Sequence, residues 1–156
     1  MTVSYRDAVT TEIENELTLL SRYHVHAKRG GFQLDRSAYL LLGRLELEHP
    51  LSLKQLAEAF RLDISTINRQ IAALLRLDLV ERVLDPEGGI ARKIEATALG
   101  LELLHADRNL GRAGIERVVA EWSDQDLNEL SRLLAKFNRG IELLEGNPWP
   151  RTTPIR

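Results

Sequence analysis

Five polar residues with hydrogen-bonding side chains stand close together near the middle of the chain. They are Ser65, Thr66, Asn68, Arg69 and Gln70. An arginine can donate two hydrogen bonds to O6 and N7 of guanine, and an asparagine or glutamine amide can pair with adenine. Serine and threonine hydroxyls bind phosphate groups. Side chains of these types on one helix predict contact with DNA in the major groove.

The segment 64–77 that carries them is amphipathic when its residues are placed about 100° apart around a helix. Its expected core face consists of Ile64, Ile67, Ile71, Leu74 and Leu75. The opposite face holds Ser65, Arg69, Ala72, Ala73 and Arg76. An ordinary solvated face more often mixes Glu with Lys, whereas this segment contains no acidic residue. We therefore favour a DNA-reading helix, with Arg76 as a further contact, over a merely solvated amphipathic helix.

The neighbouring residues complete a helix–turn–helix followed by a β-hairpin. Ser52 and Gln55 have capping-box spacing, so a helix is expected to begin at Ser52 and to end before a tight turn at 61–63. Asp63 can cap the next helix. Two short β-like runs, 80–84 and 92–96, enclose a segment with proline and two glycines, which predicts a hairpin with a flexible tip.

Helical periodicity also covers both ends of the chain. Apolar residues repeat at three- and four-residue steps in 5–28, and the glycines that follow are expected to end that helix. Asp35 or Ser37 can cap a second helix that reaches about residue 48. Thr97 can cap a long fifth helix to about residue 122, and Ser123 can open a sixth to about residue 145.

The sixth helix carries apolar residues at heptad spacing, which places them on one narrow seam. Two interpretations stay open: the seam packs against the chain's own fifth helix, or it forms a dimer interface together with the first and fifth helices. We favour the dimer. The residues expected in that interface are Val9, Ile13, Leu17, Leu127, Leu130, Leu134, Phe137 and Ile141.

Composition and motif content exclude several classes of protein. The chain has 156 residues, a net charge of −2 and no cysteine, which excludes disulfides and thiolate metal sites. No glycine-rich phosphate loop or catalytic signature is present, so neither an enzyme nor a cofactor is expected. His24 and His26 stand two residues apart and point to different sides of a helix, so no metal is expected. No apolar run approaches about 18 residues, which predicts a cytoplasmic protein without a membrane span.

Three runs, 51–60, 62–74 and 79–82, together resemble the winged helix–turn–helix of the MarR family of bacterial transcriptional regulators. Asp85–Pro86, Ala91, Thr97 and Gly100 are similar to that family's wing and to the start of its fifth helix. The resemblance implies a mainly α fold with a small β wing, flanked by N- and C-terminal dimerisation helices. It also implies an obligate homodimer that regulates transcription through pseudo-palindromic operator DNA and is usually released by a small molecule.

The chain departs from the family pattern at two places. Asp78 stands where the family usually has glycine at the exit of the recognition helix, and aspartate tolerates the left-handed conformation. Gly89 and Ile90 lie near the position of the wing-tip arginine that normally enters the minor groove. Arg92 and Lys93 are then the nearest basic residues, and two interpretations stay open: one of them replaces the wing-tip arginine in contacting DNA, or the wing contributes less to binding.

The resemblance thus implies a homodimeric transcriptional regulator, in our interpretation a repressor, that binds double-stranded operator DNA and is released by a small aromatic or amphipathic effector, whose contact residues the sequence does not identify. The neutral charge and the missing wing arginine favour an alternative, a winged-helix module that binds another protein and not DNA. The expected division is a dimerisation helix in 1–30, a DNA-binding lobe in 31–100, dimerisation helices in 101–145 and a loosely ordered tail in 146–156. Whether Trp149 in that tail docks onto a partner subunit stays open.

Overall fold

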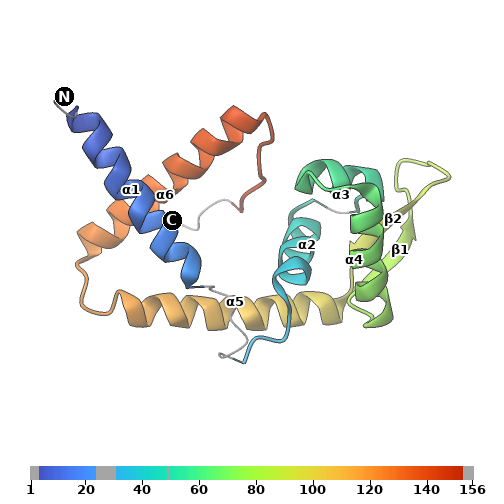
Figure 1. Ribbon diagram of the computed structural model, residues 1–156. Helices are drawn as coiled ribbons and strands as arrows, with labels where there is room; N and C mark the ends of the chain where they lie inside the picture. The colour runs from blue at the N-terminus through green and yellow to red at the C-terminus, as the bar shows by residue number, and fades with distance from the viewer. Residues whose placement is uncertain (1–3, 24–30, 49, 153–156) are drawn as a thin grey trace.

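The computed structural model describes residues 4–23, 31–48 and 50–152, and within these ranges it contains six helices and one two-stranded antiparallel sheet. The elements are α1 (Tyr5–Arg22), α2 (Arg36–Leu47), α3 (Leu53–Phe60), α4 (Ile64–Arg76), β1 (Val80–Leu84), β2 (Arg92–Ala96), α5 (Ala98–Val118) and α6 (Asp124–Glu145). Figure 1 shows α5 as a long helix with α2, α3, α4 and the hairpin at one end and with α1 and α6 at the other. The order and type of the elements confirm the predicted winged helix–turn–helix fold. Within the described ranges, no helix is long and apolar enough to cross a membrane.

Residues 31–104 form a lobe with one apolar core, which we call the winged lobe. Its most deeply buried side chains come from α2, α3, α4, β2 and the start of α5. They are Leu41, Leu42, Leu45, Leu56, Ile67, Ile71, Ile94 and Leu104. Burial of these side chains is the main stabilising contribution that fixes α4 against α2 and α3.

Local capping signals set where the helices of the lobe begin. The Asp35 carboxylate accepts from the N–H of Ala38 at 2.8 Å, so Asp35 and not Ser37 caps α2. Ser52 and Gln55 form the predicted capping box at the start of α3. Asp63 occupies the N-cap position of α4, but its side chain accepts no capping hydrogen bond. Side-chain caps therefore set the starts of α2 and α3, whereas the predicted side-chain cap by Asp63 does not form at the start of α4.

The hairpin is held to the lobe at its base. Val80 pairs with Ala96 and Leu84 with Arg92, while Leu51 exchanges backbone hydrogen bonds with Ile94. Asp78 has φ of 56°, which confirms the left-handed conformation expected at this position.

At the start of α5, Gly100 lies against the backbone of the preceding turn. A Cβ atom at Gly100 would come within 2.1 Å of the Leu79 carbonyl oxygen. Only glycine permits this close approach, which sets the distance between α5 and the hairpin.

Two helix ends and one core assignment differ from the predictions. The helix predicted for 5–28 ends at Arg22, and residues 24–30 lie outside the described residues. The fifth helix ends at Val118 rather than near 122. Ile64 was expected in the core, but it is 54% exposed. Ile64 is the first residue of α4, and its side chain points back toward the helix N-terminus, so it extends past the core layer.

Polar contacts attach α5 to the last turn of α2. The Glu46 carboxylate accepts from Arg108 Nη2 at 2.7 Å and also contacts His105 Nε2. The hydrogen bond from Arg108 is the main cause that lowers the pKa of Glu46 below its ordinary value. Since Arg108 and His105 belong to α5 and Glu46 to α2, this cluster ties the lobe to the long helix.

Candidate nucleic-acid interface

The recognition helix α4 turns its apolar side inward and its polar side outward. Ile67 and Ile71 are completely buried and Leu74 is 4% exposed, so the helix cannot rotate without exposing core residues. Ser65, Asn68, Arg69 and Arg76 are exposed on the other side, and Thr66 and Gln70 are half-buried. The structure thus brings the six α4 residues that were predicted to contact DNA to accessible positions on a single helix.

The charge on this face is available to a ligand. Within the described residues, neither Arg69 nor Arg76 forms an ion pair with the protein. Their guanidinium groups can therefore donate to phosphate or to base edges without first breaking an internal contact. An arginine that binds phosphate directly from water loses less free energy than one that must first give up an ion pair with a carboxylate.

The two wing candidates do not have equivalent surroundings. Lys93 Nζ lies 3.2 Å from Asp85 Oδ1, and both side chains are only 16% exposed. Arg92 is exposed and is adjacent to Lys93 on β2, so the two side chains point to opposite faces of the hairpin. Arg92 is thus free to reach a ligand, whereas Lys93 stabilises the turn of the wing.

Asp85 organises that turn, a role that was not among the predicted sites. Its Oδ1 accepts from the N–H of Glu87 at 3.0 Å, and this bond, with a smaller effect of Lys93, lowers the pKa of the Asp85 carboxyl. Gly88 follows with φ of 88°. An Asp–Pro pair followed by glycine is typical of such a turn, so the sequence did contain the signal.

A cavity of about 590 Å³ opens between the start of α2, the inner edge of α4 and the start of α5. Its apolar lining is Leu34, Ala38, Leu41, Ala73, Leu74, Leu77, Leu79, Leu99 and Leu103. Polar groups at its border include Arg69 and Gln70, two of the predicted base-reading residues. The volume is in the range of small-molecule sites. Sequence reasoning could not identify this lining because it combines several separate segments.

The seam on α6 is exposed in the single chain. Leu130, Leu134, Phe137 and Ile141 are 38–45% exposed, and α6 has no buried residue. Packing against the chain's own α5 therefore does not bury the seam. Ile13 and Leu17 on α1 are also about 40% exposed, while Val9 and Leu127 are half-buried.

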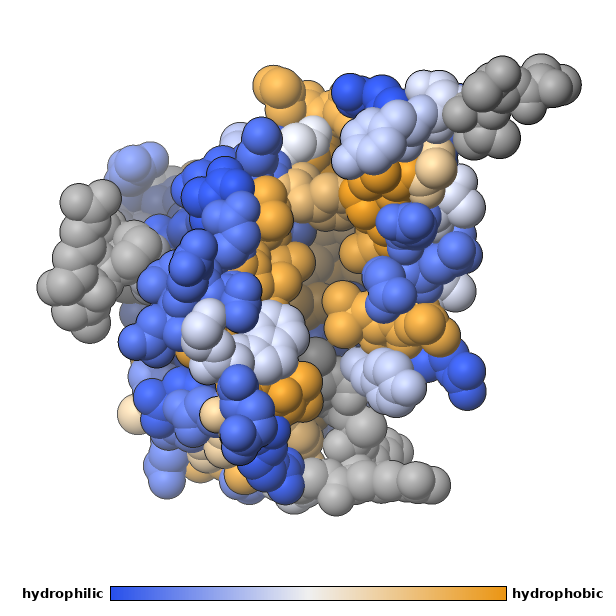
Figure 2. Space-filling view, turned by 90° about the vertical axis from the view of Figure 1, so that its left-hand side faces the viewer, coloured by the Kyte–Doolittle hydropathy of each residue, from blue (hydrophilic) through white to orange (hydrophobic). Residues whose placement is uncertain are grey.

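Figure 2 views the end of the molecule that carries α1 and α6 and shows apolar side chains along both sides of a hollow. We call this surface, formed by α1 and α6, the apolar end face. A large apolar surface of this kind on a water-exposed chain usually marks an interaction site.

No metal-ligating arrangement appears among the residues that the structure describes. No group of three His, Cys, Asp or Glu side chains gathers there. His24 and His26 lie outside the described residues. His105 is engaged with Glu46.

Comparison with known proteins links this geometry to one family. A sequence model of the MarR family matches residues 32–89, which span α2 to the wing. A protein of Bacillus subtilis (strain 168), named "Uncharacterized HTH-type transcriptional regulator YxaD", is 41% identical over 133 residues, covering 83% of this chain and 92% of the relative.

Two solved structures show the same fold. A MarR family protein from Bacillus stearothermophilus superposes with a TM-score of 0.76 at 19% identity, covering 90% of this chain and 99% of that one. The S. aureus MepR bound to ethidium bromide superposes with a TM-score of 0.58 at 18% identity, covering 89% and 97%.

Proposed function

The chain belongs to the MarR family of transcriptional regulators, and from this premise we propose that it is a homodimeric repressor of pseudo-palindromic operator DNA. In this proposal α4 enters the major groove and Arg92 contacts DNA from the wing. Arg69, with Asn68 or Gln70, reads bases, while Ser65, Thr66 and Arg76 hold the phosphate backbone.

One observation carries the proposal. Among the described residues, the outer face of α4 presents two arginines without an ion pair and no carboxylate, while its inner face is held by completely buried isoleucines. A rigid, narrow helix with this charge matches the width and potential of the major groove. An ordinary solvated helix surface more often mixes acidic with basic residues, which form ion pairs with one another.

The apolar end face supports assembly as a homodimer. Its α6 seam has coiled-coil spacing, and a second copy supplies an identical, self-complementary surface. A twofold dimer would carry two copies of α4, and these would enter successive major grooves about 34 Å apart. Such an arrangement reads an inverted repeat, which is what a pseudo-palindromic operator provides.

The cavity beside α4 supports control by a small ligand. Its leucine lining suits an aromatic or amphipathic molecule, and ethidium in the MepR structure is an aromatic ligand of a protein with the same fold. A ligand seated in the cavity borders Arg69 and Gln70, so its binding and DNA binding involve the same side chains. A preference of a few kcal/mol for the DNA-free conformation is enough to release the operator.

Selection from a pool of random duplexes tests this function. Repeated binding and amplification should enrich an inverted repeat whose half-sites are centred about one helical turn apart. Enrichment of no common sequence would refute operator binding. Enrichment of a single unpaired half-site would refute recognition by a dimer.

The exposed wing tip without arginine and the neutral charge favour a second candidate, a winged-helix module that binds another protein. A salt titration separates the two. DNA binding should weaken steeply with salt, with a slope of about −0.9 per phosphate neutralised, whereas a mainly apolar protein contact should not. Failure to bind any duplex at about 50 mM salt would favour the protein-binding module.

A further inference from the structure

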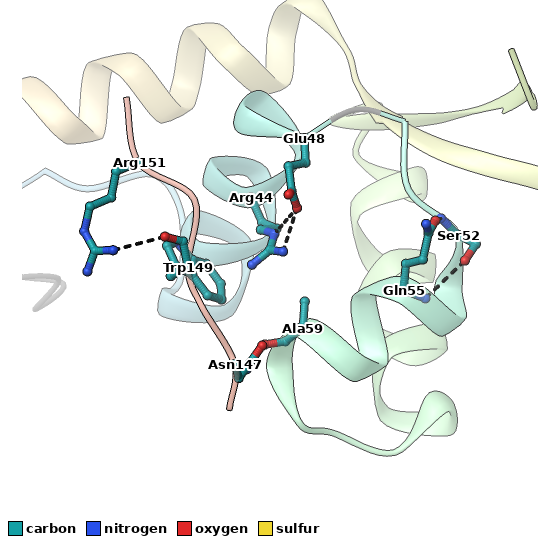
Figure 3. A network of polar contacts seen from close by, with 8 residues as sticks. All are labelled: Arg44, Glu48, Ser52, Gln55, Ala59, Asn147, Trp149 and Arg151. Atoms are coloured by element: carbon teal, nitrogen blue, oxygen red, sulfur yellow. Dashed lines mark hydrogen bonds and ion pairs between the residues drawn. The ribbon is translucent and has the colours of Figure 1, made fainter. Parts of the chain in front are cut away.

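We propose that Trp149 is a positioning residue that fixes the angle between α6 and the winged lobe and so determines which half-site spacing the dimer accepts. This inference rests on the proposed function. Residues 147–151, which we call the C-terminal strap, leave the end of α6 and contact α2 and α3 (Figure 3). The tail 146–156 was predicted to be loosely ordered, but its described residues, 146–152, make specific contacts.

The strap begins with a sharp reversal at the end of α6. Gly146 has φ of 61°, its N–H donates to the Leu143 carbonyl at 3.3 Å, and the N–H of Asn147 donates to the Glu142 carbonyl at 3.1 Å. These two bonds form a Schellman motif, which ends a helix in a defined direction. The chain therefore leaves α6 at a fixed angle.

Asn147 makes the first contact with the lobe. Its Nδ2 donates to the Ala59 carbonyl oxygen at 3.0 Å. This carbonyl belongs to the last turn of α3, where carbonyls lack a partner within the helix. The hydrogen bond thus satisfies an otherwise open acceptor and fixes the strap to α3.

Trp149 makes the central contact, because its ring stacks on the buried guanidinium group of Arg44. The guanidinium carbon of Arg44 lies 4.7 Å from the centre of the Trp149 ring, and Phe60 meets the same ring edge-on at 5.1 Å and 86°. Arg44 is 8% exposed and its Nε donates to Glu48, but its Nη1 has no hydrogen-bond partner in the described residues. The electron-rich ring face offsets the missing acceptor. Trp149 therefore contacts α2 and α3 together.

Arg151 returns the strap to α6. Its guanidinium contacts the Glu142 carboxylate through both terminal nitrogens, one at 3.0 Å, and also donates to the Trp149 carbonyl oxygen at 3.1 Å. The hydrogen bond from Arg151 is the main cause that lowers the pKa of Glu142. The strap is thereby attached to α6 through Arg151 and to the lobe through Asn147 and Trp149.

Within the described residues, two connections join the winged lobe to α6. One is α5, which runs continuously from the lobe toward α6, and the other is the strap (Figure 1). A body attached at one point can pivot, whereas a body attached at two points keeps its angle. Because the apolar face of α4 is packed against the core of the lobe, the angle of the lobe sets the separation of the two copies of α4 in a dimer.

The test uses the full-length dimer and the duplex enriched from the random pool. Half-sites are moved closer or further apart by one and two base pairs, and a duplex with a single half-site serves as reference. Dissociation constants are measured by fluorescence anisotropy for wild type, Trp149→Ala, Trp149→Phe and Asn147→Asp. The matched control is Leu143→Ala, a change of an 83% exposed apolar residue one turn before the strap.

Trp149→Ala should lower the discrimination between optimal and displaced spacings by about tenfold, because a cation–π contact and an aromatic pair together have that order of effect. Affinity for the single half-site should stay unchanged. Trp149→Phe and Asn147→Asp should give intermediate discrimination, and Leu143→Ala should match wild type. These two milder variants keep the test valid if Trp149→Ala fails to fold.

Three results would overturn the inference. The first is an unaltered spacing profile in the Trp149 and Asn147 variants. The second is an equal loss of affinity on every duplex, the single half-site included, which indicates a purely structural role. The third is a wild type that enriches no duplex at all, which refutes the proposed function as well; in the first two cases only the inference about Trp149 fails.

Discussion

The buried carboxylate of Asp107 in α5 accepts a hydrogen bond from the backbone N–H of Leu34, 73 residues earlier, with an Oδ2–N distance of 2.8 Å. The same carboxylate accepts from the N–H of Gln33 at 3.0 Å. Asp107 is completely buried, so its carboxylate accepts these hydrogen bonds out of contact with water. One side chain thus fixes the chain entering α2 against the middle of α5.

Asp107→Ala should destabilise the protein by about 3 kcal/mol, because it leaves the buried N–H of Leu34 and the partly buried N–H of Gln33 without their acceptor. Urea unfolding followed by circular dichroism measures the change. Asp107→Asn should cost less, since the amide oxygen still accepts. The control Asp124→Ala, in the exposed first turn of α6, should change stability by no more than about 1 kcal/mol. Equal effects of the changes at 107 and 124 would contradict the role of the buried carboxylate.

Arg69→Ala should abolish specific operator binding while leaving the dimer mass and the melting temperature unchanged. Loss of a bidentate base contact costs about 1–3 kcal/mol in discrimination. The exposed side chain of Arg69 forms no ion pair in the part of the chain that the structure describes, so folding should not respond. Footprinting and calorimetry measure the two effects. Arg112→Ala, an exposed change on α5, is the matched control, and a normal footprint with Arg69→Ala would remove the assignment of α4.

Phe137→Glu should convert the dimer into a monomer. Phe137 is 45% exposed at the centre of the α6 seam, and a carboxylate there would be buried without a partner on dimerisation. Analytical ultracentrifugation gives the mass. Ile90→Glu, at the fully exposed wing tip, is the control and should leave the mass unchanged. A Phe137→Glu protein of dimer mass would show that the seam is not the interface.

Gly100→Ala should destabilise the winged lobe by about 3 kcal/mol, since the added Cβ would lie 2.1 Å from the Leu79 carbonyl oxygen. Gly114→Ala, in the same helix but outside the winged lobe, should instead stabilise the protein by about 1 kcal/mol, because, apart from its own stretch of helix, nothing in the described chain lies within 4 Å of the added Cβ and alanine favours a helix. Thermal unfolding of both variants checks the opposite signs. The same sign for both would argue against the close approach at Gly100.

Glu46→Gln should lower stability by about 1 kcal/mol at pH 7, and the deficit should disappear in acid. The pKa of Glu46 is lower in the folded protein than its ordinary value of 4.5, mainly because Arg108 donates to it. Such a group stabilises the fold above its unfolded pKa, and the stabilisation is lost as the pH falls through the folded pKa. Melting temperatures of wild type and variant should therefore converge below about pH 4.5. Glu121→Gln should show no such convergence.

Short-range signals in the sequence determined most of the fold. The Ser52–Gln55 capping box and the bounds of both strands followed from chemistry between residues a few positions apart. For α2 the sequence offered Asp35 or Ser37 as the cap, and the structure shows Asp35. The buried face of α4 followed from helical period, with the exception of Ile64. The polar face of α4 was predictable for the same reason, because a locked apolar side leaves only one orientation for the rest.

Tertiary structure decided what depends on residues distant in the chain. Lys93 meets Asp85 only because the hairpin closes, and the cavity beside Arg69 exists only because α2, α4 and α5 converge. Trp149 in a proline-rich tail carries no local signal for the lobe; its place over Arg44 arises because the reversal at Gly146 directs the strap there. Local pattern fixes backbone conformation and amphipathic faces, whereas pairing between distant segments depends on how packed elements meet, which no short window of sequence encodes.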